Sequence, residues 1–150
     1  MATPIIRSVT GTAIARTFAN AVASAAYANI ADALRIQMSV LSTPGLLLAD
    51  FRLTGVVFSA APVTGSIQLA KIPRDAAGTQ GPTPSASLVP TQVYTFGPTP
   101  AAANALTGWI MSIDSVPLDA DADYWVFNNG TGASMALGMI LTAVPWSPGT

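Results

Sequence analysis

Apolar and polar residues alternate in short runs along the second part of the chain, which is typical of strands that bury one face. The runs 47–58 and 66–72 each place alternate apolar residues on one side. A turn that contains Pro and Gly separates them. The pattern therefore predicts two strands joined as a β-hairpin.

Four further runs follow the same alternation, at 91–96, 106–116, 124–128 and 134–146. The dipeptide Asn129-Gly130 precedes the last run, and it favours tight turns because it tolerates positive φ angles. The sequence thus predicts a second hairpin, between the run 124–128 and a long closing strand over 134–146.

Two long Pro-rich segments, 73–90 and 97–105, interrupt the strands and show no pattern that packs. We expect them to be loops, which often carry function in compact domains. About seven or eight strands lie between residues 34 and 146, without alternating helices. The chain is therefore predicted to be mainly β, with a single antiparallel, jelly-roll-like β-sandwich over residues 46–150.

Residues 1–45 form a separate, Ala-rich N-terminal segment, whose first 17 residues are predicted to be an extended arm. From Phe18 to Met38, apolar residues recur at every fourth position, which favours a helix, whereas alternation over 33–41 favours a strand. We expect a short helix or irregular segment to about residue 32, followed by a strand. The segment packs either on its own sandwich or on a neighbouring subunit.

The composition removes most catalytic chemistry. The 150 residues include no His, no Cys and no Glu, and only 9% are charged. Disulfides, thiolate metal sites, and the usual Ser-His-Asp and zinc hydrolases are excluded on this basis. We therefore predict that the chain is not an enzyme and has no cofactor and no metal.

The charge pattern bears on partners. Six Lys and Arg residues are scattered along the chain and the net charge is −1, so nucleic acid is not an expected partner. No targeting or membrane-spanning segment is recognisable, and no membrane association is expected. With 13 charged groups and a mean hydropathy of +0.50, much of the surface is predicted to be buried against other chains, as in a homo-oligomer.

The sharpest charged motif is the alternation Asp119, Asp121, Asp123. Such spacing occurs in calcium loops, but the Gly and the distant Glu of those loops are missing, so a solvated turn is favoured. Asp114 lies near this cluster in the sequence, and paired carboxylates serve glycoside hydrolysis; with seven Asp in the chain, such pairs arise by chance. Lys71, the single lysine, has no recognisable catalytic partner.

The aromatic residues Trp109, Tyr124, Trp125 and Phe127 suggest either a core or a sugar-stacking platform, and the core or a subunit interface is favoured. Tyr124 and Trp125 must point to opposite faces of their strand.

Asn129-Gly130-Thr131 matches a glycosylation sequon, but turn chemistry explains it. The residues predicted to contact a partner are Ile5, Ile6, Arg7, Arg16, Phe18, Tyr27 and Trp125.

The segments 49–79 and 113–135 resemble small virion proteins of tailed bacteriophages. The resemblance rests on the hairpin motif at 62–69, the element Asp75-Ala76-Ala77-Gly78, and the closing motif at 117–132. The Pro/Ala/Thr loop after the first motif departs from the Tyr-rich loop usual in that group.

This resemblance implies a jelly-roll-like capsid decoration (cement) protein that forms a homotrimer on the major capsid protein. Its location would be the capsid surface of the virion, after synthesis in the host cytoplasm. The alternative is a phage tail or fibre subunit whose loops 73–90 and 97–105 bind a host surface glycan.

Overall fold

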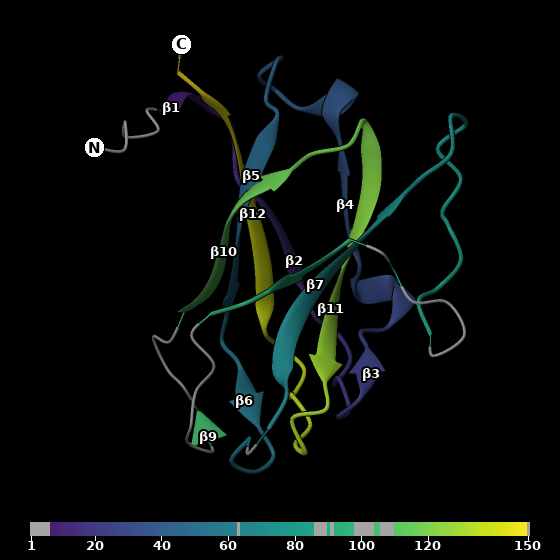
Figure 1. Cartoon of the computed structure of the whole chain (residues 1–150), viewed down its shortest axis with the longest axis vertical. Helices are drawn as coiled ribbons and strands as arrows, with labels where there is room; N and C mark the ends of the chain where they lie inside the picture. The colour runs from purple at the N-terminus through teal and green to yellow at the C-terminus, as the bar shows by residue number, and fades with distance from the viewer. Residues whose placement is uncertain are drawn as a thin grey trace.

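The computed structural model describes residues 7–62, 64–85, 90, 92–97, 104–105 and 110–149. These residues form two antiparallel sheets that pack face to face (Figure 1). The predicted mainly-β sandwich is therefore confirmed. Within the described ranges, no helix is both long and apolar enough to span a lipid bilayer.

The first sheet has the order β1-β12-β5-β10, and β2 also pairs with β12. Its strands are β1 (Arg7–Thr10), β2 (Ile14–Thr17), β5 (Leu48–Thr54), β10 (Ile110–Pro117) and β12 (Ile140–Pro148).

The second sheet has the order β3-β11-β7-β8, and β4 also pairs with β11. Its strands are β3 (Ala26–Tyr27), β4 (Leu34–Gln37), β7 (Ser66–Pro73), β8 (Val93–Thr95) and β11 (Asp121–Asn129). A small extra sheet joins β6 (Val57–Phe58) to β9 (Asn104–Ala105).

The strand order is that of a jelly roll. If β1/β2 and β3/β4 are each taken as one interrupted strand, the described sheets run first-eighth-third-sixth and second-seventh-fourth-fifth. Consecutive strands thus alternate between the two sheets, except that β8 stays beside β7.

This topology shows that both predicted hairpins are wrong. β5 and β7 lie in different sheets, and so do β11 and β12. The chain does reverse near Gly65 and Gly130, both with positive φ. Turn residues determine where a chain reverses, whereas the pairing partner is determined by which faces the two sheets bury against each other.

The closing strand is also shorter than predicted. β12 begins at Ile140, and residues 130–139 form a loop that Gly138 (φ +91°) helps to bend. Met135 and Met139 are buried, but Leu137 between them is exposed. The apparent alternation therefore comes from a loop that places two methionines in the core.

The N-terminal segment supplies strands to both sheets. Of the two alternatives left open to about residue 32, the irregular segment forms and the short helix does not, and the strand expected over 33–41 is β4 (Leu34–Gln37). Only two three-residue 3₁₀ helices occur between residues 18 and 42, Ile30–Asp32 and Met38–Val40. The buried Asp32 carboxylate accepts the N–H groups of Ala19 and Asn20, which holds an open turn in place of a helix. Pairing with β11 and β12 outweighs the weak helical preference of an Ala-rich stretch.

The core lies between the sheets and is closed by the chain itself. Its accessible surface of 7587 Å² is close to the roughly 7,100 Å² expected for a monomer of this mass. The largest side chains of the core include Phe18, Phe51, Phe58, Phe96, Ile36, Leu53, Ile67, Leu69 and Tyr124. The low surface charge therefore does not reflect an unfinished core.

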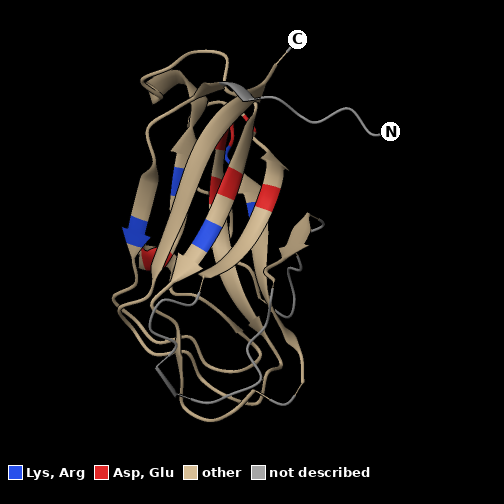
Figure 2. Ribbon diagram, turned by 90° about the vertical axis from the view of Figure 1, so that its left-hand side faces the viewer, with Lys and Arg blue, Asp and Glu red and all other residues tan. Residues whose placement is uncertain are grey.

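The two ends of the sandwich differ in charge. β1, the C-terminal end of β12 and the turn before β11 lie at one end, and the charged residues gather towards it (Figures 1 and 2). The loops 18–25, 55–62 and 130–139 at the opposite end contain no Lys, Arg, Asp or Glu. We refer to these three described loops as the uncharged end.

Candidate functional site

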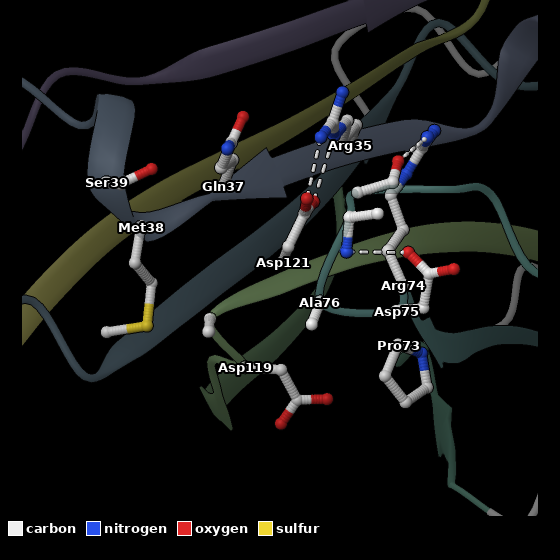
Figure 3. A pocket seen from close by; sticks show the side chains of 13 residues that line it. Arg35, Gln37, Met38, Ser39, Pro73, Arg74, Asp75, Ala76, Asp119 and Asp121 are labelled. Carbon is white, nitrogen blue, oxygen red and sulfur yellow. Dashed lines mark hydrogen bonds and ion pairs between the residues drawn. The ribbon is translucent and has the colours of Figure 1, made fainter.

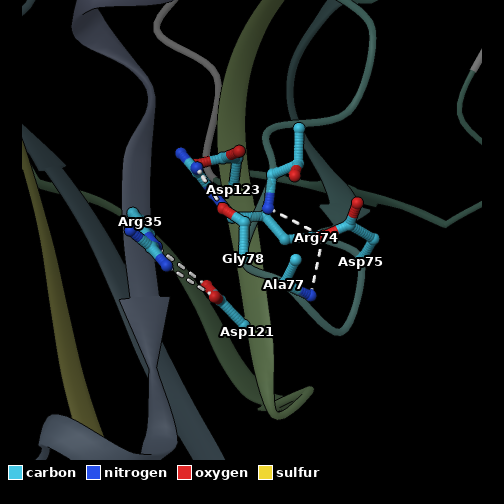
Figure 4. Close-up of polar contacts among 8 residues, drawn as sticks. Arg35, Arg74, Asp75, Ala77, Gly78, Asp121 and Asp123 are labelled. Atoms are coloured by element: carbon cyan, nitrogen blue, oxygen red, sulfur yellow. Dashed lines mark hydrogen bonds and ion pairs between the residues drawn. The ribbon is translucent and has the colours of Figure 1, made fainter.

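The Asp119–Asp121–Asp123 motif spans the turn before β11 and the start of that strand, and each of its carboxylates pairs with a cation from another part of the chain. Asp121 and Asp123 alternate with buried core residues, so both project from the outer face of the second sheet. Arg35 donates Nε and Nη2 to Asp121, at 2.9 and 2.6 Å (Figure 4). These hydrogen bonds hold the pKa of the Asp121 carboxyl below its ordinary value. Arg74 Nη2 lies 3.0 Å from Asp123 Oδ1.

Lys71 pairs with Asp119, the remaining aspartate of the motif, at the end of the sandwich. Its side chain is only 2% exposed, and Nζ donates to Asp119 Oδ1 at 3.2 Å and to the Pro117 carbonyl at 3.1 Å. Lys71 is therefore a desolvated lysine with a carboxylate partner, a pairing that no sequence pattern indicates.

This pairing explains the motif without a metal. In the described part of the chain, no cluster of three or more Asp side chains is placed to hold an ion. The favoured solvated turn is also incomplete as an interpretation, because each aspartate has its own cation. Asp114 projects from the exposed outer face of the first sheet, so the sandwich separates it from Asp121 and Asp123.

A pocket of about 660 Å³ opens beside these pairs. Its walls come from β4, the following 3₁₀ helix, the turn before β11, and residues 73–78 (Figure 3). Arg35 and Arg74 line it beside aspartates, so the cations in its wall are already paired with carboxylates.

Residues 74–85, here called the strap, cross the outer face of the second sheet after β7 (Figure 1). Asp75 closes the first turn of the strap: its Oδ1 accepts the N–H groups of Thr79 at 2.8 Å and Ala77 at 3.0 Å. These backbone hydrogen bonds, chiefly that from Thr79, lower the pKa of Asp75. Arg74 Nη1 donates to the Gly78 carbonyl at 2.9 Å.

Gly78 lets the strap lie close to the sheet. Its φ is +78°, and a Cβ at this position would lie 3.1 Å from Arg35 Nη2. This fit, like the ion pair of Arg74, joins the strap to residues far away in sequence. The expectation that 73–90 is a loop without packing is therefore incomplete, since its first part is docked on β4 and β11.

The other end of the strap borders a second pocket, of about 320 Å³. The strap residues Thr83, Pro84 and Ser85 face a stacked pair of aromatic rings, Tyr27 and Phe127, across it. The ring centroids are 4.2 Å apart and the rings are inclined by 15°. Partial burial raises the pKa of Tyr27.

Trp125 lies between the two pockets on the same face of β11, and it is 1% exposed. As predicted, Tyr124 points the opposite way, into the core. The prediction that Trp125 contacts a partner does not fit its burial within the chain. Among the described residues, three buried atoms in this region have no hydrogen-bond partner: Trp125 Nε1, Asp123 Oδ2 and Arg74 Nε.

The uncharged end is held together by neutral hydrogen bonds. The buried Asn128 donates Nδ2 to the carbonyls of Val22 at 3.2 Å and Ala133 at 2.7 Å, and it accepts the Thr131 hydroxyl at 2.7 Å. Thr131, the sequon threonine, is itself fully buried. The interpretation of Asn129-Gly130-Thr131 as turn chemistry agrees with this arrangement.

Apolar side chains remain exposed at and beside this end. Leu137 is 63% exposed, and Ile110 and Ile140 are 49% and 37% exposed. The register of the first sheet places Ile110, Thr54, Ile140 and Thr17 in one row across β10, β5, β12 and β2. This row continues the uncharged surface onto the outer face of the first sheet.

The other predicted contact residues have varied positions. Phe18 is 1% exposed and its N–H bonds to Met139, so it offers no surface to a partner. Arg16 lies on the edge strand β2 and donates to the Ala31 carbonyl. Arg7 begins β1. Ile5 and Ile6 lie outside the described residues, as does Trp109 of the proposed aromatic platform.

Comparisons of this chain with protein-family models, curated proteins and solved structures give no match.

Proposed function

We propose that the chain is a non-enzymatic virion structural protein of the capsid decoration (cement) type. In this proposal it binds the major capsid protein at the capsid surface as a homotrimer, after synthesis in the host cytoplasm. The jelly-roll topology is compatible with this role, because the fold recurs in viral capsid domains, although it also occurs in lectins and enzymes.

The observation that carries the proposal is the uncharged end. Its loops present Ala, Gly and Ser with an exposed Leu137, and the row through Ile110 and Ile140 adjoins them. Surfaces of this kind associate by burying apolar area, at about 25 cal/mol per Å² before the costs of association. We assign the contacts between copies to this surface.

The charges are arranged in a way that suits such an assembly. Lys71, Arg35 and Arg74 each lie beside an aspartate of the same chain, so none of these pairs needs a partner subunit. Association through the opposite end buries no Lys, Arg, Asp or Glu from its three loops. The contacts therefore depend little on salt, which screens charges but not apolar burial.

The mass of the purified chain in solution tests this proposal. Light scattering across a range of NaCl concentrations is expected to give the mass of a trimer that changes little with salt. A monomer at all concentrations, or a trimer that dissociates as salt rises, would contradict the assignment of the contacts to an uncharged surface. Addition to empty capsids then tests decoration directly.

A further inference from the structure

We propose that the outer face of β11 is a binding groove for a neutral oligosaccharide, with the strap lying across its middle. This inference goes beyond the virion role proposed above and does not depend on it. It starts from the order of side chains along one strand. Asp121, Asp123, Trp125 and Phe127 alternate with core residues and share the outer face.

The two pockets lie at the two ends of this row. Asp121 lines the larger pocket and Phe127 lines the smaller one. Between residues 121 and 127 the strand rises by about 20 Å, from 3.3 Å per residue. Trp125 and Asp123 lie in the interval, each 1% exposed. The strap meets this row at two places. Arg74 pairs with Asp123, and residues 83–85 lie opposite Phe127 across the smaller pocket.

Buried polar atoms on this face indicate what the groove recognises. Trp125 Nε1 and Arg74 Nε are donors and Asp123 Oδ2 is an acceptor, and all three are buried without a partner among the described residues. Unpaired buried polar groups are costly, so native structures contain few of them. A sugar hydroxyl both donates and accepts, so a single class of ligand satisfies Trp125 Nε1 and Asp123 Oδ2 once the strap, which carries Arg74, lifts.

The aromatic end of the groove fits the same ligand. Tyr27 and Phe127 are only partly buried and form one side of the smaller pocket, and the Thr83 and Ser85 hydroxyl-bearing side chains form another. Aromatic faces pack against the C–H faces of sugar rings, while nearby hydroxyls provide polar contacts. The pocket contains no charged lining residue.

The charges of the groove argue against an anionic ligand. Arg35, on β4, pairs with Asp121 independently of the strap, and the closed strap pairs Arg74 with Asp123. A phosphate or sulfate would have to compete with those carboxylates, and Asp75 adds a further negative charge to the larger pocket. A neutral chain of a few sugar units does not compete with those carboxylates and is not repelled by Asp75.

The first test uses four neutral probes: cellotetraose, maltotetraose, mannotetraose and chitotetraose. Binding is followed by the indole N–H signals of the ¹⁵N-labelled chain. We expect at least one probe to shift the Trp125 signal, while the Trp146 signal stays, because its Nε1 already donates to Asp50 at 2.9 Å. Trp125→Phe assigns the signal.

Variants separate binding from folding. Phe127→Ala removes a ring from the smaller pocket and is expected to weaken binding at least tenfold. Trp125→Phe replaces the indole by a smaller phenyl ring and removes the unpaired N–H, so it is expected to weaken binding about tenfold, and its melting temperature reports separately the cost of the lost volume. Ile110→Ala, on the outer face of the first sheet, is the matched control and should leave binding unchanged.

A strap-loosened variant covers the case in which the closed strap excludes every probe. Gly78→Ala introduces a side chain at φ +78° against Arg35, which loosens the docked strap. Binding by Gly78→Ala alone still supports the groove. The proposal is overturned if neither wild type nor Gly78→Ala binds any of the four probes. It is equally overturned if a probe binds but Phe127→Ala and Trp125→Phe leave its affinity unchanged.

Discussion

The two ends of this sandwich use opposite means to hold their loops. At one end, Lys71, Arg35 and Arg74 pair with the aspartates that open β11. At the other end, Asn128 and Thr131 bind backbone carbonyls and each other. Loop 18–25 is also held by a carboxylate from outside the loops, because Asp32 accepts the N–H groups of Ala19 and Asn20. Ion pairs thus hold the first end, whereas hydrogen bonds hold the described loops of the other.

The difference between the two ends shows where a chain with few charged residues places them. Charges placed as internal pairs stabilise turns but add little net field at the surface. Neutral hydrogen bonds at the opposite end satisfy buried polar groups and leave an apolar surface outside. The end without ions is thus the one suited to lie against another protein, and each prediction below breaks one side of this contrast.

The largest effect is expected from Asp119→Ala. It removes the carboxylate from Lys71, whose ammonium is buried and retains only the Pro117 carbonyl. A buried charge that loses its partner destabilises strongly, and we expect a loss of about 3 kcal/mol in the free energy of unfolding. Urea denaturation measures it. Asp114→Ala is the control, and it should change the free energy by less than about 0.5 kcal/mol; equal effects would contradict the role of the pair.

Asn128→Ala tests the uncharged end in the same way. The substitution leaves the buried carbonyls of Val22 and Ala133 without this amide and the Thr131 hydroxyl without its acceptor. We expect a loss of about 2 kcal/mol, measured by thermal and urea unfolding. Asn129→Ala, one residue along and partly exposed, is the matched control. A tolerant Asn128→Ala would mean that the loops pack without this network.

The sequence revealed the fold class but not the way the strands connect. Alternation predicts strands because it depends on one face being buried, and this is a local property. The pairing of β5 with β12 and β10 is not local, so the two hairpins expected from turn signals are wrong. Of the two alternatives left open before residue 32, the short helix does not form, because backbone pairing with β11 overrides an Ala-rich pattern, and the segment is irregular.

The candidate site was only partly visible in the sequence, for a related reason. The spacing of Asp119, Asp121 and Asp123 marks them as unusual, but Arg35 is 86 residues from Asp121 along the chain, and no sequence rule pairs them. The strap gave no periodic signal, since Gly78 and Asp75 dock it through single contacts. The aromatic stack likewise depends on the pairing of β3 with β11.

A smaller effect is expected from acid. The pKa of Asp121 is lower in the folded chain than its ordinary value of 3.8, chiefly because of the hydrogen bond from Arg35. A depressed pKa contributes stability that is present above the unfolded value and is lost as pH falls through the folded value. Unfolding midpoints should therefore drop below about pH 4. Arg35→Gln should flatten this drop, whereas Arg52→Gln, on the other sheet, should not; an identical acid response in both variants would remove Arg35 as the cause.

The central claim, that copies associate through the uncharged end, is tested most directly by one charge placed at each end of the molecule. Leu137→Asp puts a carboxylate on the uncharged end, and Val40→Asp puts one at an equally exposed apolar position beyond β4. Light scattering should give a trimer for wild type and Val40→Asp, and a folded monomer for Leu137→Asp. A Leu137→Asp chain that keeps the wild-type trimer mass, or a wild-type chain that is already a monomer, would contradict the account.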